Sequence, residues 1–247
     1  MKIVVADAPG FKASIDAITS LVEEGVFEIT KAGIYLKAMD PSQISMVSFS
    51  MPKEAFVEFN VEEERKIGLD IEQLSSVLAR GGRGEKVELG AEDGRFVVRF
   101  VGEKKKRTFK IPILDIGEGM QKEPKIEYKN LVKITAEAFR EVLKDAKLVS
   151  SHIKLSLTPA EFVAEVKGDS GDARAEFEKD SADIAELKAG ADAKATFPLQ
   201  YLEDITKASP GNEVVTIFIE TDRPLKIEYK ILGASVKYYL APRIESD

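Results

Sequence analysis

The pattern of apolar and polar positions along this chain repeats itself after about 128 residues. Three apolar positions at helical spacing, Phe11, Ile15 and Ile18, return as Phe139, Leu143 and Ala146. A second helical set returns as well, with Ile71, Leu74 and Val77 matching Leu199, Leu202 and Ile205. A strand-like run, Phe96–Phe100, returns after a slip of one residue as Leu225–Tyr229. No cluster of reactive side chains is repeated, so the pattern predicts two similar domains and a function that depends on shape.

Each half is predicted to contain two short helices. In the first half, a helix begins at Pro9 and extends to about Val22, and a second runs from about Ile71 to Ala79. Asp70 has the character of an N-cap, and Gln73 completes a capping box with it. The glycine-rich segment Gly81–Gly84 is expected to end the second helix.

The second half repeats this order. Helices are expected over Ala136–Lys147, capped by Thr135, and over Leu199–Lys207, opened by Pro198. Between the halves, Asp115–Lys129 carries Gly, Pro and mixed charge without a helical period. This segment is therefore predicted to be an extended surface linker.

Strand patterns fill most of the remaining chain. In the first half they cover Lys2–Ala6, Val26–Ile29, Gly33–Ala38, Ser45–Ser50, Lys86–Gly90, Arg95–Val101 and Arg107–Leu114. The last strand of the second half is expected over Ser235–Leu240. Many antiparallel strands with two short helices per half predict an α+β fold whose helices cover one face of the sheets. The predicted domains are 1–114 and 130–247, joined by the connector 115–129.

The composition excludes several classes of protein. The 247-residue chain has no cysteine and one histidine, His152, which argues against thiolate chemistry, most metal sites and Ser-His-Asp triads. No apolar run approaches the length of a membrane span, and no signal peptide is recognisable, so a cytosolic protein is expected. The net charge of −7 argues against a surface that is basic all over, although one basic face is compatible with it.

Basic residues gather on or beside the predicted helices. Arg140, Lys144 and Lys147 share one face of the third helix, opposite its apolar residues. The other helices contribute Lys12, Arg80, Arg83 and Lys207 at their polar sides or ends. These cations are typical of solvated helix faces, and they would also suit a surface that faces a phosphate backbone without reading bases.

Other motifs favour structural interpretations. Glu103–Arg107 is a charge run between two strand patterns, as expected for a solvated hairpin loop. Gly81–Lys86 superficially resembles a phosphate loop, but Glu85 breaks the Gly-Lys-Ser/Thr sequence that a Walker motif requires. Gly168–Gly171 misses the spacing of a nucleophile elbow by one residue. The sequence therefore offers no catalytic site.

Apolar residues with Met and aromatic character form a further set. They flank the turn Asp40-Pro41-Ser42, occur in the linker and lie near the C-terminus: Met39, Ile44, Met46, Met120, Ile126, Tyr238, Tyr239, Leu240 and Pro242. Such residues suit an adaptable peptide groove when they are accessible. The alternative is ordinary core packing.

Several segments resemble one known family. "GIYLKAMDPSQISMVSF" (Gly33–Phe49), "GAED" (Gly90–Asp93), the linker, and "KYYLAPRIE" (Lys237–Glu245) together are similar to the archaeal sliding clamps of the proliferating cell nuclear antigen family. The resemblance covers essentially the whole chain. It implies the DNA clamp fold, with two similar domains per subunit, an interdomain connector and three identical subunits in a closed ring.

The resemblance gives the basic residues a role. Those that fall on or beside the four helices lining the family's DNA channel are Lys12, Arg80, Arg83, Arg140, Lys144, Lys147 and Lys207. A sliding ring needs weak backbone contacts that are indifferent to sequence. The helix over Ile71–Ala79 has no cation of its own, and Asp16 and Asp145 would weaken the field.

The resemblance also implies a site for client proteins. Their short motif has a glutamine followed by an aliphatic residue and two aromatics. The positions that would bind it are Met39, Ile44, Met46, Ile126, Pro198, Pro224, Leu225, Tyr239, Ala241 and Pro242.

Ring closure is expected at two strand edges. Strand Thr108–Leu114 contains Pro112, which lacks a backbone donor and so belongs on an edge. The family pairs this strand with one of the next subunit, here near Ala173–Glu178. The interface residues so implied are Thr108, Phe109, Lys110, Ile111, Arg174, Ala175, Glu176 and Phe177.

As a whole, the resemblance implies a homotrimeric clamp without catalytic activity, cofactor or metal. It would encircle duplex DNA in the cytoplasm, on the nucleoid, and tether DNA polymerase, flap endonuclease, DNA ligase and other motif-bearing proteins. An ATP-driven clamp loader would open it. Two alternatives remain open: a small-molecule enzyme with a pocket between pseudo-symmetric halves, and one subunit of a heterotrimeric clamp.

Overall fold

The computed structural model describes residues 1–117, 121–169 and 171–244, so Met120 and Ser170 lie outside the described residues. The chain divides into two compact units. Unit one consists of Met1–Pro41, Val47–Lys122 and Lys230–Val236. Unit two consists of Ser42–Met46, Glu123–Tyr229 and Lys237–Asp247.

The described residues of unit one hold two α-helices, one 3-10 turn and nine strands, together with the end of β17 (Leu225–Ile231) and the start of β18 (Ala234–Leu240). In chain order the two helices, the turn and the nine strands are β1 (Lys2–Val5), α1 (Ala8–Thr19), β2 (Glu24–Thr30), β3 (Gly33–Met39), β4 (Ser45–Pro52), η1 (Lys53–Ala55), β5 (Glu58–Asn60), β6 (Arg65–Asp70), α2 (Ile71–Leu78), β7 (Lys86–Glu92), β8 (Arg95–Val101) and β9 (Lys106–Pro112). Strand β4 belongs to unit one from Val47 onward. One sheet has the order β5-β1-β7-β8-β9, and β6, β2, β3 and β4 follow one another in a second.

Unit two repeats this arrangement. Its elements are β10 (Leu131–Thr135), α3 (Ala136–Lys147), β11 (His152–Leu157), β12 (Glu161–Gly168), β13 (Gly171–Glu178), β14 (Ile184–Lys188), β15 (Ala193–Pro198), α4 (Leu199–Lys207), β16 (Val214–Phe218), β17 (Leu225–Ile231) and β18 (Ala234–Leu240). Strand β17 belongs to unit two as far as Tyr229, and β18 belongs to it from Lys237 onward. The order β14-β10-β16-β17-β18 matches β5-β1-β7-β8-β9, and β15-β11-β12-β13 matches β6-β2-β3-β4. The repeat seen in the sequence is thus a repeat of topology, and the predicted α+β fold is confirmed.

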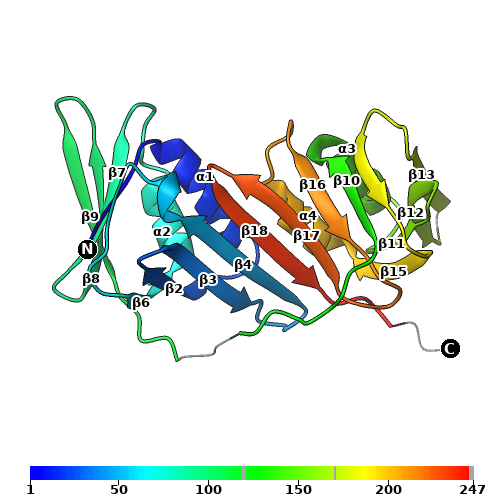
Figure 1. The fold of residues 1–247 in the computed structure, drawn as a ribbon, viewed down its shortest axis with the longest axis horizontal. Helices are drawn as coiled ribbons and strands as arrows, with labels where there is room; N and C mark the ends of the chain where they lie inside the picture. The colour runs from blue at the N-terminus through cyan, green and yellow to red at the C-terminus, as the bar shows by residue number, and fades with distance from the viewer. Residues whose placement is uncertain (118–120, 170, 245–247) are drawn as a thin grey trace. The chain divides into compact units, whose positions relative to one another are not determined.

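The repeated apolar positions form the cores under the helices. Phe11 and Ile15 of α1 are buried, as are their counterparts Phe139 and Leu143 of α3. The helices α1 and α2 pack against each other in unit one, and α3 and α4 do so in unit two (Figure 1). The match fails at one position: Val77 is only half-buried, and Leu78 takes the buried place at the end of the shorter α2.

The capping signals in the sequence are confirmed. The Asp70 carboxylate accepts a hydrogen bond of 2.7 Å from the Gln73 backbone N–H, and the Thr135 hydroxyl accepts one of 3.3 Å from Ala138. Both bonds satisfy donors that lack a partner in the first helical turn. Pro198 precedes α4 and forms no side-chain cap, because its side chain has no polar atom.

Some predicted boundaries were wrong. The first helix ends at Thr19 instead of Val22, because the Thr19 and Ser20 hydroxyls bond to the carbonyls of Asp16 and Ala17 in its last turn. The strand expected to reach Leu114 ends at Pro112, where its ladder with β8 stops. Leu114 instead forms an isolated bridge with Gly68. The short strands β5 and β6 were missed.

The predicted linker 115–129 carries no regular secondary structure in its described part, residues 115–117 and 121–129. The charge run Glu103–Arg107 falls on the β8–β9 hairpin, as predicted for a solvated turn.

Candidate functional site

The predicted channel cations of unit two are engaged with the protein itself. Nη1 of Arg140, on α3, donates to the backbone oxygens of Thr206 (3.3 Å) and Ser209 (2.6 Å) and to the Ser209 hydroxyl (2.9 Å). These oxygens lie at and just beyond the end of α4, where helix carbonyls lack intrahelical partners and the helix dipole is negative. Arg140 therefore joins α3 to the C-terminus of α4.

The lysines on the same helices are paired with carboxylates. Lys144 lies 2.5 Å from Glu141, and Lys147 lies 2.9 Å from Glu203 of α4. In unit one, Lys12 is paired with Asp16, whose other oxygen accepts a 2.6 Å hydrogen bond from Ser75 of α2. Exposed pairs of this kind contribute little to stability and exchange readily for another anion. They also neutralise part of the basic charge predicted for these faces.

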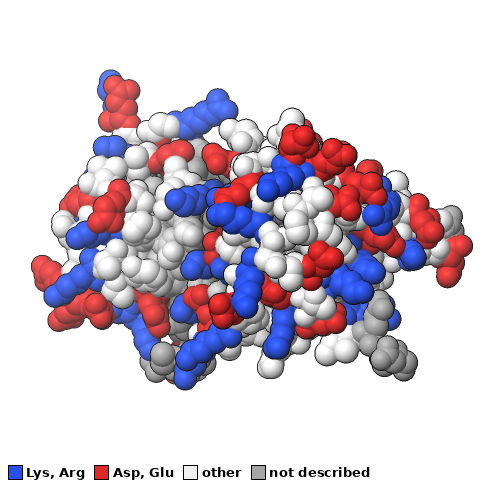
Figure 2. Space-filling view, turned by 45° about the vertical axis from the view of Figure 1, so that its right-hand side comes forward, with Lys and Arg blue, Asp and Glu red and all other residues white. Residues whose placement is uncertain are grey.

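Three of the predicted cations are unpaired within the described part of the chain. Arg80, Arg83 and Lys207 are exposed and take part in no ion pair there. Lys207 is the last residue of α4, and Arg80 and Arg83 lie in the segment that joins α2 to β7. On the face shown in Figure 2, basic and acidic side chains are interleaved. The unpaired members of the predicted set therefore lie at the end of α4 and beyond the end of α2.

A shallow hollow of about 280 Å³ is lined by residues of α3 and α4. Its polar lining includes Arg140, Lys144, Lys147, Glu203 and Lys207. The hollow thus combines four cations with the two carboxylates Glu203 and Asp204, which suits contact with a polyanion.

Four segments of the predicted client site meet in unit two. The backbone N–H of Ala241 donates to the Ile44 carbonyl (2.9 Å), and the Ser45 hydroxyl donates to the Tyr239 carbonyl (3.1 Å). The connector joins them through Tyr128, whose hydroxyl donates to the Pro224 carbonyl (2.9 Å). These bonds bring together the turn before β4, the end of β18, the β16–β17 loop and the connector.

The predicted client residues differ in exposure. Ile44 is exposed, whereas Met46 and Leu225 are buried and so lie beneath the surface. Half-buried positions are Met39, Ile126, Pro198, Pro224, Ala241 and Pro242. Met39 belongs to unit one, and the others belong to unit two.

The sequence analysis did not identify Glu123, whose side chain bonds directly to a side chain of the predicted client site. Its carboxylate accepts a 2.8 Å hydrogen bond from the Tyr239 hydroxyl. Burial and this neighbouring carboxylate raise the pKa of Tyr239 above its ordinary range. The search for apolar connector residues led to Ile126, and no local pattern marks Glu123 as a partner of Tyr239.

The two predicted interface strands both lie at sheet edges. β9 ends the five-stranded sheet and β13 ends the four-stranded sheet. Phe109 of β9 is half-buried with its ring centroid 5.8 Å from that of Phe100, and Phe177 of β13 lies 6.3 Å from Phe162. Thr108, Lys110, Arg174 and Glu176 are exposed, whereas Ile111 is buried.

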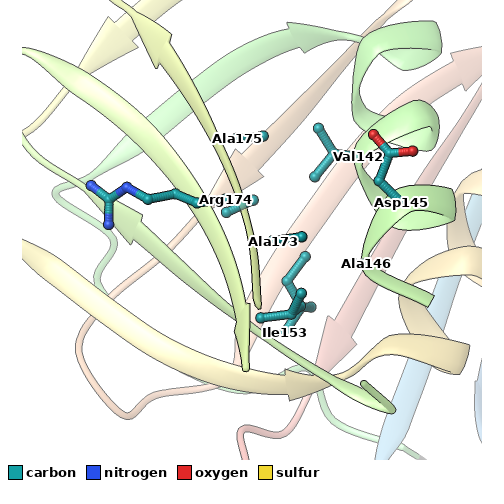
Figure 3. Close-up of a pocket in the computed structure, with 9 residues that line it drawn as sticks. Val142, Asp145, Ala146, Ile153, Ala173, Arg174 and Ala175 are labelled. Atoms are coloured by element: carbon teal, nitrogen blue, oxygen red, sulfur yellow. The ribbon is translucent and has the colours of Figure 1, made fainter. Parts of the chain in front are cut away.

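A small hollow of about 50 Å³ lies behind β13 (Figure 3). The short side chains of Ala173 and Ala175 leave this space open, and Val142 and Ala146 of α3 close its other side. The Arg174 side chain points away from it (Figure 3). The inner side of this edge is thus mainly apolar, with Asp145 as its acidic member, and is incompletely filled, while its outer side is charged.

Taken together, the duplicated topology, the helix surfaces and the free strand edges define a scaffold of two similar units. Family models match both halves: "Proliferating cell nuclear antigen, N-terminal domain" over residues 2–116 and "Proliferating cell nuclear antigen, C-terminal domain" over residues 122–244. The chain belongs to the proliferating cell nuclear antigen family.

Individual relatives agree with this assignment. A "DNA polymerase sliding clamp" of Methanococcus maripaludis is 40% identical over 242 residues, with 96% of each chain covered. The solved structure of the Thermococcus kodakaraensis clamp is 26% identical with a TM-score of 0.93, covering 98% of this chain and 99% of the other. A structure with the C-terminal region of FEN-1 bound to the A. fulgidus clamp is 26% identical with a TM-score of 0.89, covering 100% and 99%.

The described residues contain neither a candidate membrane-spanning helix nor a candidate metal-binding cluster. None of their helices is long and apolar enough to cross a membrane. In the same residues, no group of three or more His, Cys, Asp or Glu side chains is arranged to hold a metal ion.

Proposed function

We propose that this protein is a homotrimeric sliding clamp that encircles duplex DNA and tethers DNA polymerase and other replication and repair enzymes to it. It has no catalytic activity of its own. Processivity then comes from topology, because a closed ring cannot leave the duplex sideways. The observation that carries this proposal is the duplicated fold with free edges at β9 and β13.

The duplication itself supports pairing between β9 and β13. The counterpart of β9 in the second unit is β18, and the counterpart of β13 is β4. Residues next to the start of β4 already hydrogen-bond to the end of β18, through Ile44 with Ala241 and Ser45 with Tyr239. Pairing β9 of one subunit with β13 of the next repeats this contact between chains, and three such heterologous contacts close a ring.

The two edges are complementary in charge and shape. The outward side chains of β9 include Lys106 and Lys110, whereas β13 presents mainly acidic residues, Asp172, Glu176 and Glu178. Opposite charges on paired strands stabilise the pair and disfavour the wrong partner. On the inner side, Phe109 of one subunit would occupy the alanine-lined hollow of the next. Complementary edges within one chain favour a homotrimer over a heterotrimer.

Within the ring, the four helices of each subunit face the DNA. The predicted channel cations would contact phosphates without reading sequence, as sliding requires. The ion pairs of Lys12, Lys144 and Lys147 can exchange their carboxylates for phosphates. Arg80, Arg83 and Lys207 are available without exchange.

Client proteins bind the apolar surface of unit two beside the connector. This assignment is supported by the A. fulgidus relative, whose solved structure carries the C-terminal region of FEN-1. The clients we propose are DNA polymerase, flap endonuclease, DNA ligase and the clamp loader, acting in the cytoplasm on the nucleoid. The domains we propose are 1–114 and 130–247, with 115–129 as the connector.

The test of this function is stimulation of a family-matched replicative polymerase on a long primed template. The protein with its loader should lengthen the products made in one binding event. A linear template with free ends should lose the protein by sliding, whereas a circular template should retain it. Equal retention on both templates would contradict topological linkage.

A further inference from the structure

The connector is fastened to unit two at three points. Besides the bond from Tyr239 to Glu123, Tyr128 donates to the Pro224 carbonyl, and the Glu220 carboxylate accepts hydrogen bonds from Lys129 and Asn130. The bond between Glu123 and Tyr239 joins a side chain of the connector to a side chain of the proposed client surface. It is therefore the contact that a client can disturb.

This contact places a carboxylate against an otherwise apolar residue. Tyr239 is 7% exposed, and its hydroxyl is satisfied by Glu123 at 2.8 Å. A hydrogen bond to an ionised acceptor is stronger than a neutral one. An aromatic client residue that covered Tyr239 would remove water from this carboxylate and offer it no donor, which is unfavourable. Glu123 must then release Tyr239 and turn back to solvent.

We propose that Glu123 is a latch on the client surface, closed onto Tyr239 in the free clamp and opened when a client docks. The inference rests on the proposed client-binding function. The latch lowers the affinity of every client that brings no donor for the carboxylate. It thereby keeps binding weak enough for successive clients to exchange on one ring.

The test uses a fluorescently labelled peptide with the glutamine-aliphatic-aromatic-aromatic motif and uncharged neighbours, titrated with the full-length clamp. Tyr239→Phe keeps the ring and removes only the hydroxyl, and Glu123→Ala removes the acceptor. Each should tighten peptide binding by about three- to tenfold, the range expected for one hydrogen bond to a charged group that water partly replaces. The double variant should bind no more tightly than either single variant, because both remove the same bond.

The matched control is Glu127→Ala, which removes an exposed carboxylate from the same connector and so makes the same change in net charge as Glu123→Ala. It should leave the peptide affinity unchanged. Unchanged or weaker binding by Tyr239→Phe and Glu123→Ala, or additive gains in the double variant, would overturn the latch while leaving the client surface in place. Failure of the wild type and all variants to bind the peptide would instead refute the client surface itself, and the latch with it.

Discussion

At the scale of single residues, equivalent positions of the two halves have acquired different contacts. Lys12 and Arg140 occupy the same place in the repeat, yet Lys12 pairs within its own helix and Arg140 reaches across to the end of α4. The planar guanidinium can serve several oxygens at once, which the single ammonium of lysine cannot do in the same geometry. Arg140 therefore has a structural role, whatever contact it makes with DNA.

This role predicts a loss of stability in Arg140→Gln. The change leaves the Ser209 carbonyl oxygen without the donor that Arg140 supplies, at a cost of roughly 1–3 kcal/mol. The Thr206 carbonyl keeps the backbone N–H and the hydroxyl of Ser209 as donors. The midpoint of urea-induced unfolding should fall accordingly. Lys144→Gln removes the same charge from the same helix but breaks only an exposed pair, and it should shift the free energy of unfolding by less than about 0.5 kcal/mol. Equal shifts in the two variants would argue against the structural role.

At the scale of elements, the edge strands of the sheets determine how the chain can associate with other copies. An unpaired strand edge can pair with another chain, so a protein must either block that pairing or form a specific interface there. β9 and β13 carry opposite charge on their outer sides, and β13 has an unfilled apolar hollow on its inner side. These features are expected of strand edges that pair with another chain.

Phe109→Ala should therefore weaken the trimer. The substitution removes the aromatic side chain that we place in the hollow behind β13, and loss of a large buried aromatic at an interface typically raises the dissociation constant more than tenfold. Mass measured by light scattering over a dilution series reports this change. The control is Phe59→Ala, the same substitution at the opposite edge of the same sheet, on β5. A trimer as stable in Phe109→Ala as in Phe59→Ala would remove Phe109 from the interface.

The elements whose ends depend on neighbouring residues could be predicted from the sequence. The ranges of α3 and α4 were confirmed at both ends because Thr135, Pro198 and the apolar periodicity act locally. The end of α1 and the short β5 and β6 depend on hydroxyl bonding and on pairing with distant strands, which periodicity does not reveal. The bond between Glu123 and Tyr239 joins residues 116 positions apart, and only the folded chain brings them together.

At the scale of the whole molecule, an acidic chain can hold DNA if contacts are confined to one surface. The net charge of −7 repels DNA from most of the exterior, while exposed cations lie at the end of α4 and beyond the end of α2. Interleaved carboxylates keep the attraction modest. A weak and unspecific field suits a ring that has to slide.

Replacing Arg80, Arg83 and Lys207 together by Gln should reduce polymerase stimulation without changing the mass of the protein. Fewer phosphate contacts should also flatten the salt dependence of clamp retention on circular DNA, since each contact contributes to that slope. The control replaces three exposed lysines outside the four α-helices, Lys31, Lys53 and Lys179, which preserves the change in net charge. Equal losses in both triple variants would show that net charge alone is responsible.

The central claim is that the chain closes into a ring of three copies. The most direct measurement is the mass of the purified protein in solution at micromolar concentration. The account predicts a species near three times the chain mass of 27.2 kDa, stable on dilution to the concentrations used for polymerase assays. A monodisperse 27.2 kDa monomer under those conditions would contradict it.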